Sequence, residues 1–485
     1  MPDIWCDCTK TTHGIEIRNR CFLQNFPSLQ PRLPHSDSHR DAPAWLRQFL
    51  DEKNSKPPKL YAWTSANLPP TDGPPGGTLP PGVKAQRKPP ADEAKSSRVY
   101  ILGVGNIGRL YAHSLASMMR PARAPLILVV HRRDLLEHWA AHPYIELTRA
   151  DGSVEHTTAF SVEWWTEARP KHGPIAEPGG GSGIANLIVA TKAPDALPQV
   201  DRLRKYLGGA STVAFAQNGL CKLWPPHGRT YVKARFPGAK SPSWLACVTT
   251  HGVVSLGPFR SRHASVADVM LGPIRVSQAE PTGSDYLALL LKSAPGLEAR
   301  KVGRRELWVA QLEKLVVNAV INPLTAVLRC QNGEIFADRG DKLPAVIDAL
   351  LREASKTLSA LIAHPSNDVI LAEGAPAMIK TATDTKEGRR EELLQRFSTD
   401  RLRMMLHEVG AKVLENTSSM LQDVRHGKET EIDDINGWLV DTARFLGGGL
   451  KLPAHKLLIS LVKDKKALTR DELGKCFHSL LPKAA

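Results

Sequence analysis

The stretch at residues 99–119, VYILGVGNIGRLYAHSLASMM, decides the fold class. Residues 99–104 form a short apolar run of the kind that is buried in a parallel sheet, and apolar residues then recur at helical spacing. Further apolar runs follow at 126–130 (LILVV) and 185–191 (ANLIVAT). Strands that alternate with helical segments predict right-handed βαβ units, and therefore an α/β domain with a doubly wound, Rossmann-type sheet.

The turn between the first strand and its helix has the pattern G-x-G-x-x-G. With 36 glycines in the chain the pattern alone is weak, but here it directly follows a predicted strand and opens a predicted helix. The first glycine can make the tight turn, the second can admit a pyrophosphate and the third can let the helix pack closely. We therefore predict a dinucleotide site, and an ordinary strand-to-helix turn is the alternative. The predicted cofactor-binding residues of this turn are Gly103, Gly105, Asn106, Ile107 and Gly108.

The end of the second predicted strand indicates which dinucleotide binds. An NAD site carries an acidic residue there for the ribose 2′-hydroxyl, whereas this chain has Arg132 and Arg133. A guanidinium suits a 2′-phosphate, because it combines charge with bidentate hydrogen bonding. The predicted cofactor is therefore NADPH/NADP; the alternative is that the arginines only cap the start of a solvated helix.

The domain organisation follows from changes in composition along the 485 residues. Residues 1–97 are rich in Pro, Ser, Asp and Lys, which predicts a mostly disordered extension that is dispensable for chemistry, with one short helix at 44–52. Residues 98–300 are the predicted NADP-binding Rossmann domain. Residues 301–485 are predicted to be all-helical, with a polar insertion near 366–389. The helical patterns lie at 304–329, 344–363, 391–426, 431–446 and 455–463.

The most informative helical pattern is LEKLVVNAVINPLTA at residues 312–326. Lys314, Asn318 and Asn322 are spaced at i, i+4 and i+8, so they share one stripe of a helix that is otherwise apolar. Such a helix is expected to be buried, and a buried ammonium with two amides requires partners. A polar ligand is one such partner. A polar network that joins helices is the alternative.

A second cluster lies at residues 418–437, SSMLQDVRHGKETEIDDING. Ser419 and Asp423 are four residues apart and share a helix face, and Glu431 begins the next predicted helix after Gly427. Taken alone, these residues fit helix capping as well as they fit chemistry.

Together these motifs resemble the ketopantoate reductase family over most of residues 98–447. The resemblance rests on the glycine motif, Thr191-Lys192-Ala193, Gln217-Asn218-Gly219, KLVVNAVINPLTA at 314–326, Asn332-Gly333 and the 418–437 segment. It implies a helical domain like that of 6-phosphogluconate dehydrogenases and an active site between the domains. It also implies a role for each matching residue: Lys314 as the catalytic lysine, Glu431 as the acid that helps to hold the substrate and the lysine, Asn318 and Asn322 as substrate-binding amides, Ser419 as the partner of the substrate carboxylate, and Lys192 and Asn218 as neighbours of the cofactor. Asp423, on the face of Ser419, is a further candidate for substrate binding.

The family implies NADPH-dependent reduction of 2-dehydropantoate to pantoate, a step toward pantothenate. Hydride arriving at a ketone leaves negative charge on oxygen, so a proton donor is required there, and Lys314 can supply it. Two alternatives stay open: a reductase of the same fold for another 2-oxo acid, and a catalytically inactive homologue that acts as a basic, RNA-associated or regulatory protein.

Composition sets the expected partners. The net charge of +15 favours anionic ligands, but the basic residues are spread without the dense runs of a nucleic-acid-binding segment. The seven cysteines are scattered and lack paired spacing, so neither a metal nor disulfides are expected. We expect a small 2-oxo acid as partner, with no nucleic acid and no membrane, and a monomer or homodimer. The acidic residues near the amino terminus fit neither a secretory nor a transit peptide, which predicts the cytoplasm, with mitochondria as the alternative.

Overall fold

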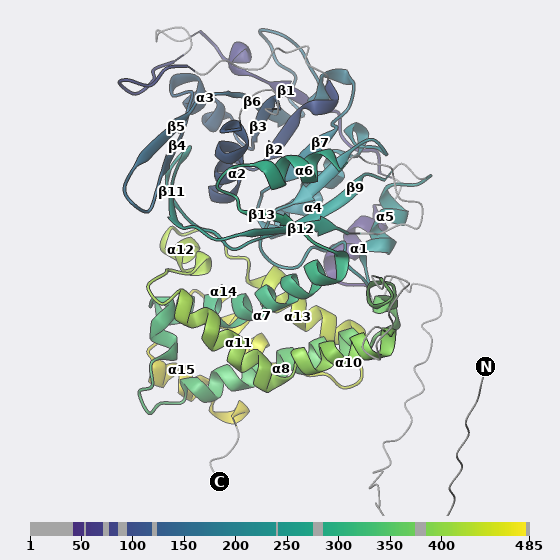
Figure 1. Ribbon diagram of the computed structural model, residues 1–485, viewed down its shortest axis with the longest axis vertical. Helices are drawn as coiled ribbons and strands as arrows, with labels where there is room; N and C mark the ends of the chain where they lie inside the picture. Colours follow the sequence, from purple (N-terminus) through teal and green to yellow (C-terminus); the bar gives the residue numbers. More distant parts are fainter. Residues whose placement is uncertain are drawn as a thin grey trace, which may run out of the picture. The chain divides into compact units, whose positions relative to one another are not determined.

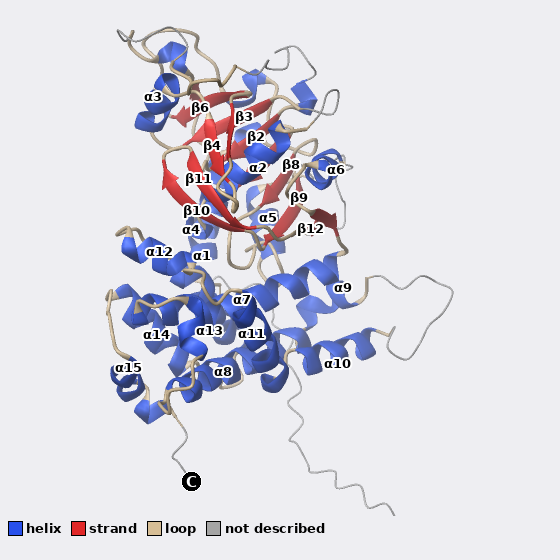
Figure 2. Cartoon of the chain, turned by 60° about the vertical axis from the view of Figure 1, so that its left-hand side comes forward, coloured by secondary structure: helices blue, strands red, loops and turns tan. Residues whose placement is uncertain are grey.

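The computed structural model describes residues 42–52, 55–70, 77–85, 95–118, 124–238, 241–274, 285–373 and 385–481. Within these residues every strand precedes Arg304, and the chain from Arg304 onward is helical (Figures 1 and 2). The predicted fold class, a Rossmann-type α/β domain followed by an all-helical domain, is therefore confirmed.

The main sheet has nine strands in the order β1-β6-β3-β2-β7-β8-β9-β12-β13. Strands β6, β3, β2, β7, β8 and β9 are parallel to one another, which is the doubly wound pattern that the alternating sequence predicts. A second sheet has the order β10-β11-β4-β5. The strands are β1 Tyr61–Trp63, β2 Val99–Leu102, β3 Leu126–Val130, β4 Ile145–Thr148, β5 Val154–Thr157, β6 Phe160–Thr166, β7 Asn186–Val189, β8 Thr212–Phe215, β9 Ser243–Thr249, β10 Gly252–Gly257, β11 Arg260–Ser265, β12 Val269–Pro273 and β13 Ala299–Lys301.

Both faces of the main sheet are covered, because alternate residues of each strand point to opposite sides. Val99 and Ile101 of β2 pack with α2 (Asn106–Ala116), α3 (Arg133–Ala141) and α6 (Tyr286–Ser293). Tyr100 and Leu102 pack on the other face with α1 (Ala44–Asp51), α4 (Ala193–Arg202) and α5 (Gly228–Arg235). This second core continues into the helical domain, so one apolar cluster joins the two domains.

The helical domain is built around α7 (Arg304–Leu328), which the neighbouring helices surround. Because Leu315, Val316, Ala319 and Val320 are almost completely buried, the apolar sides of α7 form the centre of the domain, as the sequence predicts. The other helices are α8 Leu343–Ala363, α9 Asp368–Leu371, α10 Lys386–Arg396, α11 Thr399–Lys412, α12 Ser419–Arg425, α13 Ile432–Leu446, α14 Pro453–Lys463 and α15 Arg470–Cys476.

Two details of the helical domain differ from the expectation. The pattern at 391–426 is three helices, α10, α11 and α12, because the chain leaves the helical conformation at Ser398 and again between Val413 and Ser418. The polar segment at 366–389 contains the short helix α9 and the start of α10, where the Thr385 side chain caps the helix. Residues 374–384 of that segment lie outside the described residues.

The amino-terminal segment also differs from the expectation. Helix α1 forms where residues 44–52 predict it, and it lies beside α5 (Figure 1). However, Leu46, Phe49 and Leu60 are buried in the sheet core, and β1 adds an antiparallel edge strand to β6. Composition did not predict this packing, because it indicates only whether a segment can form a core of its own. Two short apolar stretches can nevertheless dock on a core that the rest of the chain forms. A chain that starts near Ser96 would lack these core residues, so we no longer expect the described part of 1–97 to be dispensable. Residues 1–41, 53–54, 71–76 and 86–94 lie outside the described residues.

No helix in the described part of the chain combines the length and the apolar character that crossing a membrane requires.

Candidate functional site

A large cleft of about 1750 Å³ lies between the carboxyl ends of the parallel strands and helix α7. The carboxyl edge of an open parallel sheet is where ligands bind in doubly wound folds. The cleft brings together most of the predicted site residues: Gly103, Gly105, Asn106, Ile107, Arg132, Lys192, Asn218, Lys314, Asn318, Asn322, Ser419, Asp423 and Glu431. Residues from strand ends and from α7 and α12 thus face one volume, although they are up to 328 positions apart (431 minus 103).

The glycine turn has the geometry that its predicted role requires. Gly103 has a φ of +96°, which glycine adopts without strain, and it ends β2 in a tight turn. Gly108 packs so closely that a Cβ there would lie 2.0 Å from the Gly103 carbonyl oxygen. Gly105 is exposed to the cleft, and a Cβ on it would meet nothing within 4 Å. The free N–H groups at the start of α2 therefore face open space, which fits an anionic pyrophosphate.

Three buried side-chain oxygens in the cleft wall have no hydrogen-bond partner within the described part of the chain. They are Thr191 Oγ1, Gln217 Oε1 and Asn332 Oδ1. Burying an unpaired polar atom is costly, so such atoms indicate that the wall is built for a polar ligand. Thr191 follows β7, Gln217 follows β8, and Asn332 lies beyond α7. The sequence motifs contain all three residues, but only their position in the fold makes them binding candidates.

The two predicted phosphate arginines have different surroundings. Arg132 lines the cleft just beyond β3, and its side chain, 59% exposed, makes an ion pair of 3.2 Å with Asp134. Arg133 is not among the cleft-lining residues, and it makes an ion pair of 2.8 Å with Glu137 on α3. Arg132 is therefore placed to meet a 2′-phosphate. For Arg133 the placement matches the alternative of a charge on a solvated helix.

Lys314 is half-buried in the wall that α7 contributes. Its Nζ donates to the Thr249 carbonyl oxygen at 2.6 Å and to Asn218 Oδ1 at 3.2 Å. Burial lowers the pKa of the Lys314 ammonium to about 8, and the nearby negative charge of Glu431 opposes that decrease. A proton held at a pKa of about 8 is available near neutral pH and is more easily transferred than that of an ordinary lysine.

Glu431 bridges the two domains. Its side chain makes no capping bond to α13, which removes the capping interpretation. Instead Oε1 accepts from the Ala193 backbone N–H at 2.8 Å, and Oε2 accepts from Asn218 Nδ2 at 3.3 Å. Burial raises the pKa of the Glu431 carboxyl, and these hydrogen bonds lower it. Asn218 thus contacts both Glu431 and Lys314, and it fixes the lysine relative to the carboxylate.

The other polar candidates form two pairs. Asn322 Nδ2 lies 3.5 Å from Ser419 Oγ, so α7 and α12 present an amide and a hydroxyl side by side. Asp423 makes an ion pair of 3.0 Å with Lys192, whose Nζ also donates to the Glu429 carbonyl oxygen at 2.5 Å. The Asp423 carboxylate therefore has a cationic partner from the Rossmann domain. This pair connects the two walls of the cleft.

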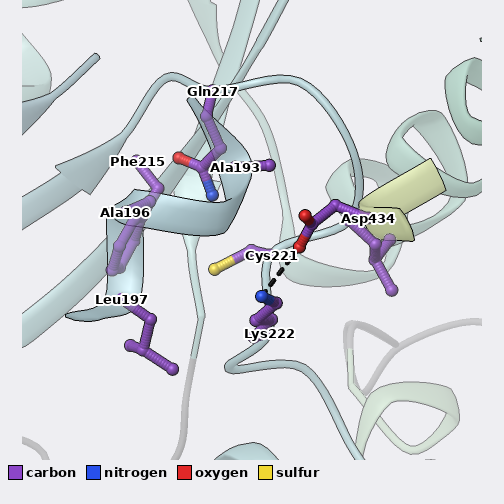
Figure 3. Close-up of a pocket in the computed structure, with 9 residues that line it drawn as sticks. Ala193, Ala196, Leu197, Phe215, Gln217, Cys221, Lys222 and Asp434 are labelled. Atoms are coloured by element: carbon purple, nitrogen blue, oxygen red, sulfur yellow. Dashed lines mark ion pairs between the residues drawn. The ribbon is translucent and has the colours of Figure 1, made fainter. Parts of the chain in front are cut away.

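A pocket of about 10 Å³, room for one water molecule, lies beside the cleft (Figure 3). Ala193 and Gln217 of the Rossmann domain and Asp434 of α13 line it. Lys222 makes an ion pair of 2.7 Å with Asp434, both of them largely buried. These contacts hold α13, and with it Glu431, against the start of α4.

Apolar side chains complete the helical wall of the cleft. Val317 and Ile321 of α7 line it beside Lys314, and Val409 and Val413 line it from α11 and its end. Helical spacing places Val317 and Ile321 on the same side as the polar stripe. The sequence predicts that this helix is apolar outside its polar stripe, but it does not single out Val317 or Ile321 as part of the site.

The fold and the site together define a two-domain class of oxidoreductase, in which a dinucleotide-type cleft meets a lysine from a helical domain. Profiles of known families agree: residues 99–275 match Ketopantoate reductase PanE/ApbA, and residues 306–466 match Ketopantoate reductase PanE/ApbA C terminal. A ketoisovalerate reductase of Gibberella fujikuroi is 41% identical over 456 residues, covering 90% of this chain and 99% of that protein. The chain belongs to the ketopantoate reductase family.

A more distant protein sequence and a solved structure are also similar to this chain. A probable 2-dehydropantoate 2-reductase of Schizosaccharomyces pombe is 28% identical over 391 residues, covering 77% of this chain and 98% of that protein. The ternary structure of D-mandelate dehydrogenase with NADH and anilino(oxo)acetate is similar with a TM-score of 0.52 at 14% identity, covering 76% of this chain and 98% of that one. At that identity the likeness supports the fold alone.

Proposed function

We propose that this protein is an NADPH-dependent reductase of a branched 2-oxo acid and that its preferred substrate is 2-ketoisovalerate. The observation that carries the proposal is Lys314, with a pKa of about 8, in the same cleft as the glycine turn. The 41% identity to a ketoisovalerate reductase, over almost all of that protein, supports the substrate. Reduction of 2-dehydropantoate, our first expectation, is the second candidate.

The residues of the cleft have separate roles in such a reaction. The glycine turn would hold the pyrophosphate of NADPH, whose nicotinamide would supply the hydride for the carbonyl carbon of the 2-oxo acid. Lys314 donates its proton to the carbonyl oxygen, where negative charge develops, and the product is the 2-hydroxy acid. Asn322 and Ser419 are placed to hold the carboxylate and so to orient the carbonyl toward Lys314. Glu431 and Asn218 position the ammonium.

Several features of the cleft fit the cofactor. A Cβ would have open space at Gly105, and Thr191 Oγ1 and Gln217 Oε1 lack partners in the described residues at the ends of β7 and β8. Arg132, beyond β3, supports NADPH over NADH, because the positions directly after that strand, His131 and Arg132, carry no carboxylate for the ribose 2′-hydroxyl. The cofactor is therefore proposed to lie across the carboxyl edge of the main sheet.

The apolar wall supports 2-ketoisovalerate over 2-dehydropantoate. Val317, Ile321 and Val413 offer methyl groups to an isopropyl side chain. The side chain of 2-dehydropantoate carries an additional hydroxymethyl group. An apolar pocket that fits an isopropyl group must exclude the added volume as well as the hydroxyl, whereas a site built to hydrogen-bond the hydroxyl rejects the analogue without it by roughly 10⁴-fold or more. The direction and size of the substrate preference therefore indicate whether the pocket is apolar or hydrogen-bonds the hydroxyl.

The test is NADPH oxidation by the purified protein with both acids. We expect a higher kcat/KM with 2-ketoisovalerate and measurable turnover of 2-dehydropantoate. A preference of about 10⁴-fold for 2-dehydropantoate would instead support the second candidate. Absence of turnover with every branched 2-oxo acid would support the inactive, regulatory alternative. Lys314→Ala is the control for catalysis by a contaminating reductase.

We propose the cytoplasm as the location of the protein, with mitochondria as the alternative, and a monomer or homodimer as its state. Microscopy of a carboxyl-terminal fluorescent fusion tests the first proposal, and sedimentation equilibrium tests the second.

A further inference from the structure

Leu60, from the amino-terminal segment, lines the same cleft as the glycine turn. The residue is 3% exposed and directly precedes β1. Because β1 is antiparallel to β6, with Tyr61 opposite Thr166, Leu60 lies at the carboxyl end of β6. That is the edge of the sheet on which the cleft opens.

The strand order determines which part of a dinucleotide can reach Leu60. From the edge inward the strands are β1, β6, β3, β2, β7 and β8. The glycine turn follows β2, whereas Asn218, which contacts Lys314, follows β8. If the pyrophosphate lies at β2 and the reacting end lies toward β8, the other half of the molecule must extend over β3 and β6 toward β1. Arg132, beyond β3, lies along this path.

The end of the cleft near β1 has apolar side chains beside two polar ones. Trp165 of β6 and Leu203 after α4 line it together with Leu60, and Gln199 and Arg202 of α4 line the cleft next to Leu203. Trp165 and Leu203 are buried, 9% and 2% exposed. Aromatic and aliphatic side chains of this kind offer apolar contact to the flat faces of an adenine ring.

We propose that Leu60 forms part of the adenine-binding wall, so that the amino-terminal segment completes the cofactor site. The inference rests on the proposed dependence on NADPH. Its ligand is the adenosine half of that cofactor, and Leu60 is a positioning residue at a distance from the reacting carbonyl.

The contacts of the segment show that its place is determined by the Rossmann domain. The Leu60 N–H donates to Tyr206 Oη at 2.9 Å, and the same hydroxyl oxygen lies 3.1 Å from Glu177 Oε2. Lys59 makes an ion pair of 3.2 Å with Glu177. Tyr206 ends the short helix η4 (Arg204–Tyr206), which directly follows Leu203 of the apolar wall. The residue that holds the Leu60 backbone, Tyr206, and Leu203 of the wall thus come from one stretch of chain.

The experiment uses 2′,5′-ADP, which has the adenosine half of NADPH and no nicotinamide. Isothermal titration into the full chain and into Leu60→Ala gives the two Kd values. We expect a Kd that is roughly five- to tenfold higher in the variant, the effect of losing one or two methylene contacts. Leu46→Ala is the matched control, because Leu46 is 1% exposed in α1 of the same segment but is not among the cleft-lining residues. Its Kd should equal that of the wild type.

Hydrogen exchange of the wild-type protein provides a second measurement that does not depend on the folding of any variant. At a 2′,5′-ADP concentration ten times the Kd, the Leu60 amide should exchange about tenfold more slowly, because opening the segment also opens the binding wall. The inference is overturned if 2′,5′-ADP binds the wild type while Leu60→Ala keeps its Kd and the exchange of residues 59–63 does not change. If neither 2′,5′-ADP nor NADPH binds the wild type, the proposed cofactor dependence fails and the inference fails with it.

Discussion

The two walls of the cleft present different chemistry. The Rossmann wall offers backbone N–H groups and a glycine that leaves space, at Gly103–Gly108, whereas the helical wall offers side chains, above all Lys314. Backbone groups at a helix start can bind a phosphate in any charge state of the protein, but only a titratable side chain can transfer a proton. In the proposed mechanism, the binding energy for the cofactor therefore comes mainly from one domain and the transferred proton from the other. Variants of the two walls should therefore differ in which kinetic constant they change.

The largest effect is expected for Lys314→Ala. In the proposed mechanism the variant removes a group whose interaction with the carbonyl oxygen is strongest in the transition state, so kcat should fall about 10²- to 10⁴-fold. The Kd for NADPH should change little, because the glycine turn is in the other domain. Steady-state kinetics and a fluorescence titration of NADPH measure the two constants. Near-normal turnover would show that the polar stripe of α7 is a structural network.

Gly105→Ala should instead change mainly the Kd for NADPH. The added Cβ meets nothing within 4 Å in the protein, so thermal stability should stay close to that of the wild type. The methyl group occupies the space that the pyrophosphate needs, and the Kd for NADPH should rise roughly ten- to a hundredfold. Gly108→Ala is the contrasting variant: its Cβ would lie 2.0 Å from the Gly103 carbonyl oxygen, so it should lose stability as well as affinity. Unchanged NADPH affinity in Gly105→Ala would contradict the placement of the pyrophosphate.

Arg132→Ala tests which part of the Rossmann wall recognises the 2′-phosphate. Its exposed guanidinium is screened by solvent, so we expect the preference of kcat/KM for NADPH over NADH to fall only about five- to tenfold. Arg133→Ala is the matched control, since Arg133 does not line the cleft and pairs with Glu137. An equal loss of NADPH preference in both variants would mean that net charge decides the preference and that the position of the arginine does not.

The smallest effect is expected for Glu431→Gln, as a shift of the alkaline limb of the pH–kcat profile. In the proposed mechanism Lys314 acts as an acid, so activity should fall as pH rises through its pKa of about 8. The negative charge of Glu431 raises that pKa, and its removal should therefore move the limb to lower pH. Asp433→Asn on the same helix is the control, because Asp433 is exposed and pairs with Lys463, and the alkaline limb of this variant should not move. A limb that moves to higher pH in Glu431→Gln would refute the assigned role of the carboxylate.

Some of these features were predictable because they depend on residues that are close in the chain. The strand, the glycine turn and α2 follow from a short apolar run, one motif and helical periodicity, all within residues 99–119. The stripe on α7 follows from a spacing of four residues. Family resemblance then connected the distant motifs, and the cleft brings them together as expected.

Other features depend on contacts between residues that are far apart in the chain. Arg132 and Arg133 are neighbours with identical side chains, and only the direction of the chain at the start of α3 places one in the cleft and the other outside it. Leu60 and Tyr206 are 146 positions apart, and no local pattern indicates their contact. For this reason the composition of residues 1–97 was a poor guide to the described part of that segment.

The sequence by itself determined the class of fold, the dinucleotide motif and the polar stripe that contains Lys314, because hydrogen-bonded turns and helical spacing are set within a few residues. Only the tertiary structure decided the pKa of that lysine and which residues form the end of the cleft near β1. The pKa of Lys314 results from burial and from Glu431, 117 positions away (431 minus 314), and the end of the cleft results from a segment that docks on the finished sheet. Burial and charge act through space, and their strength is known only once the domains have packed.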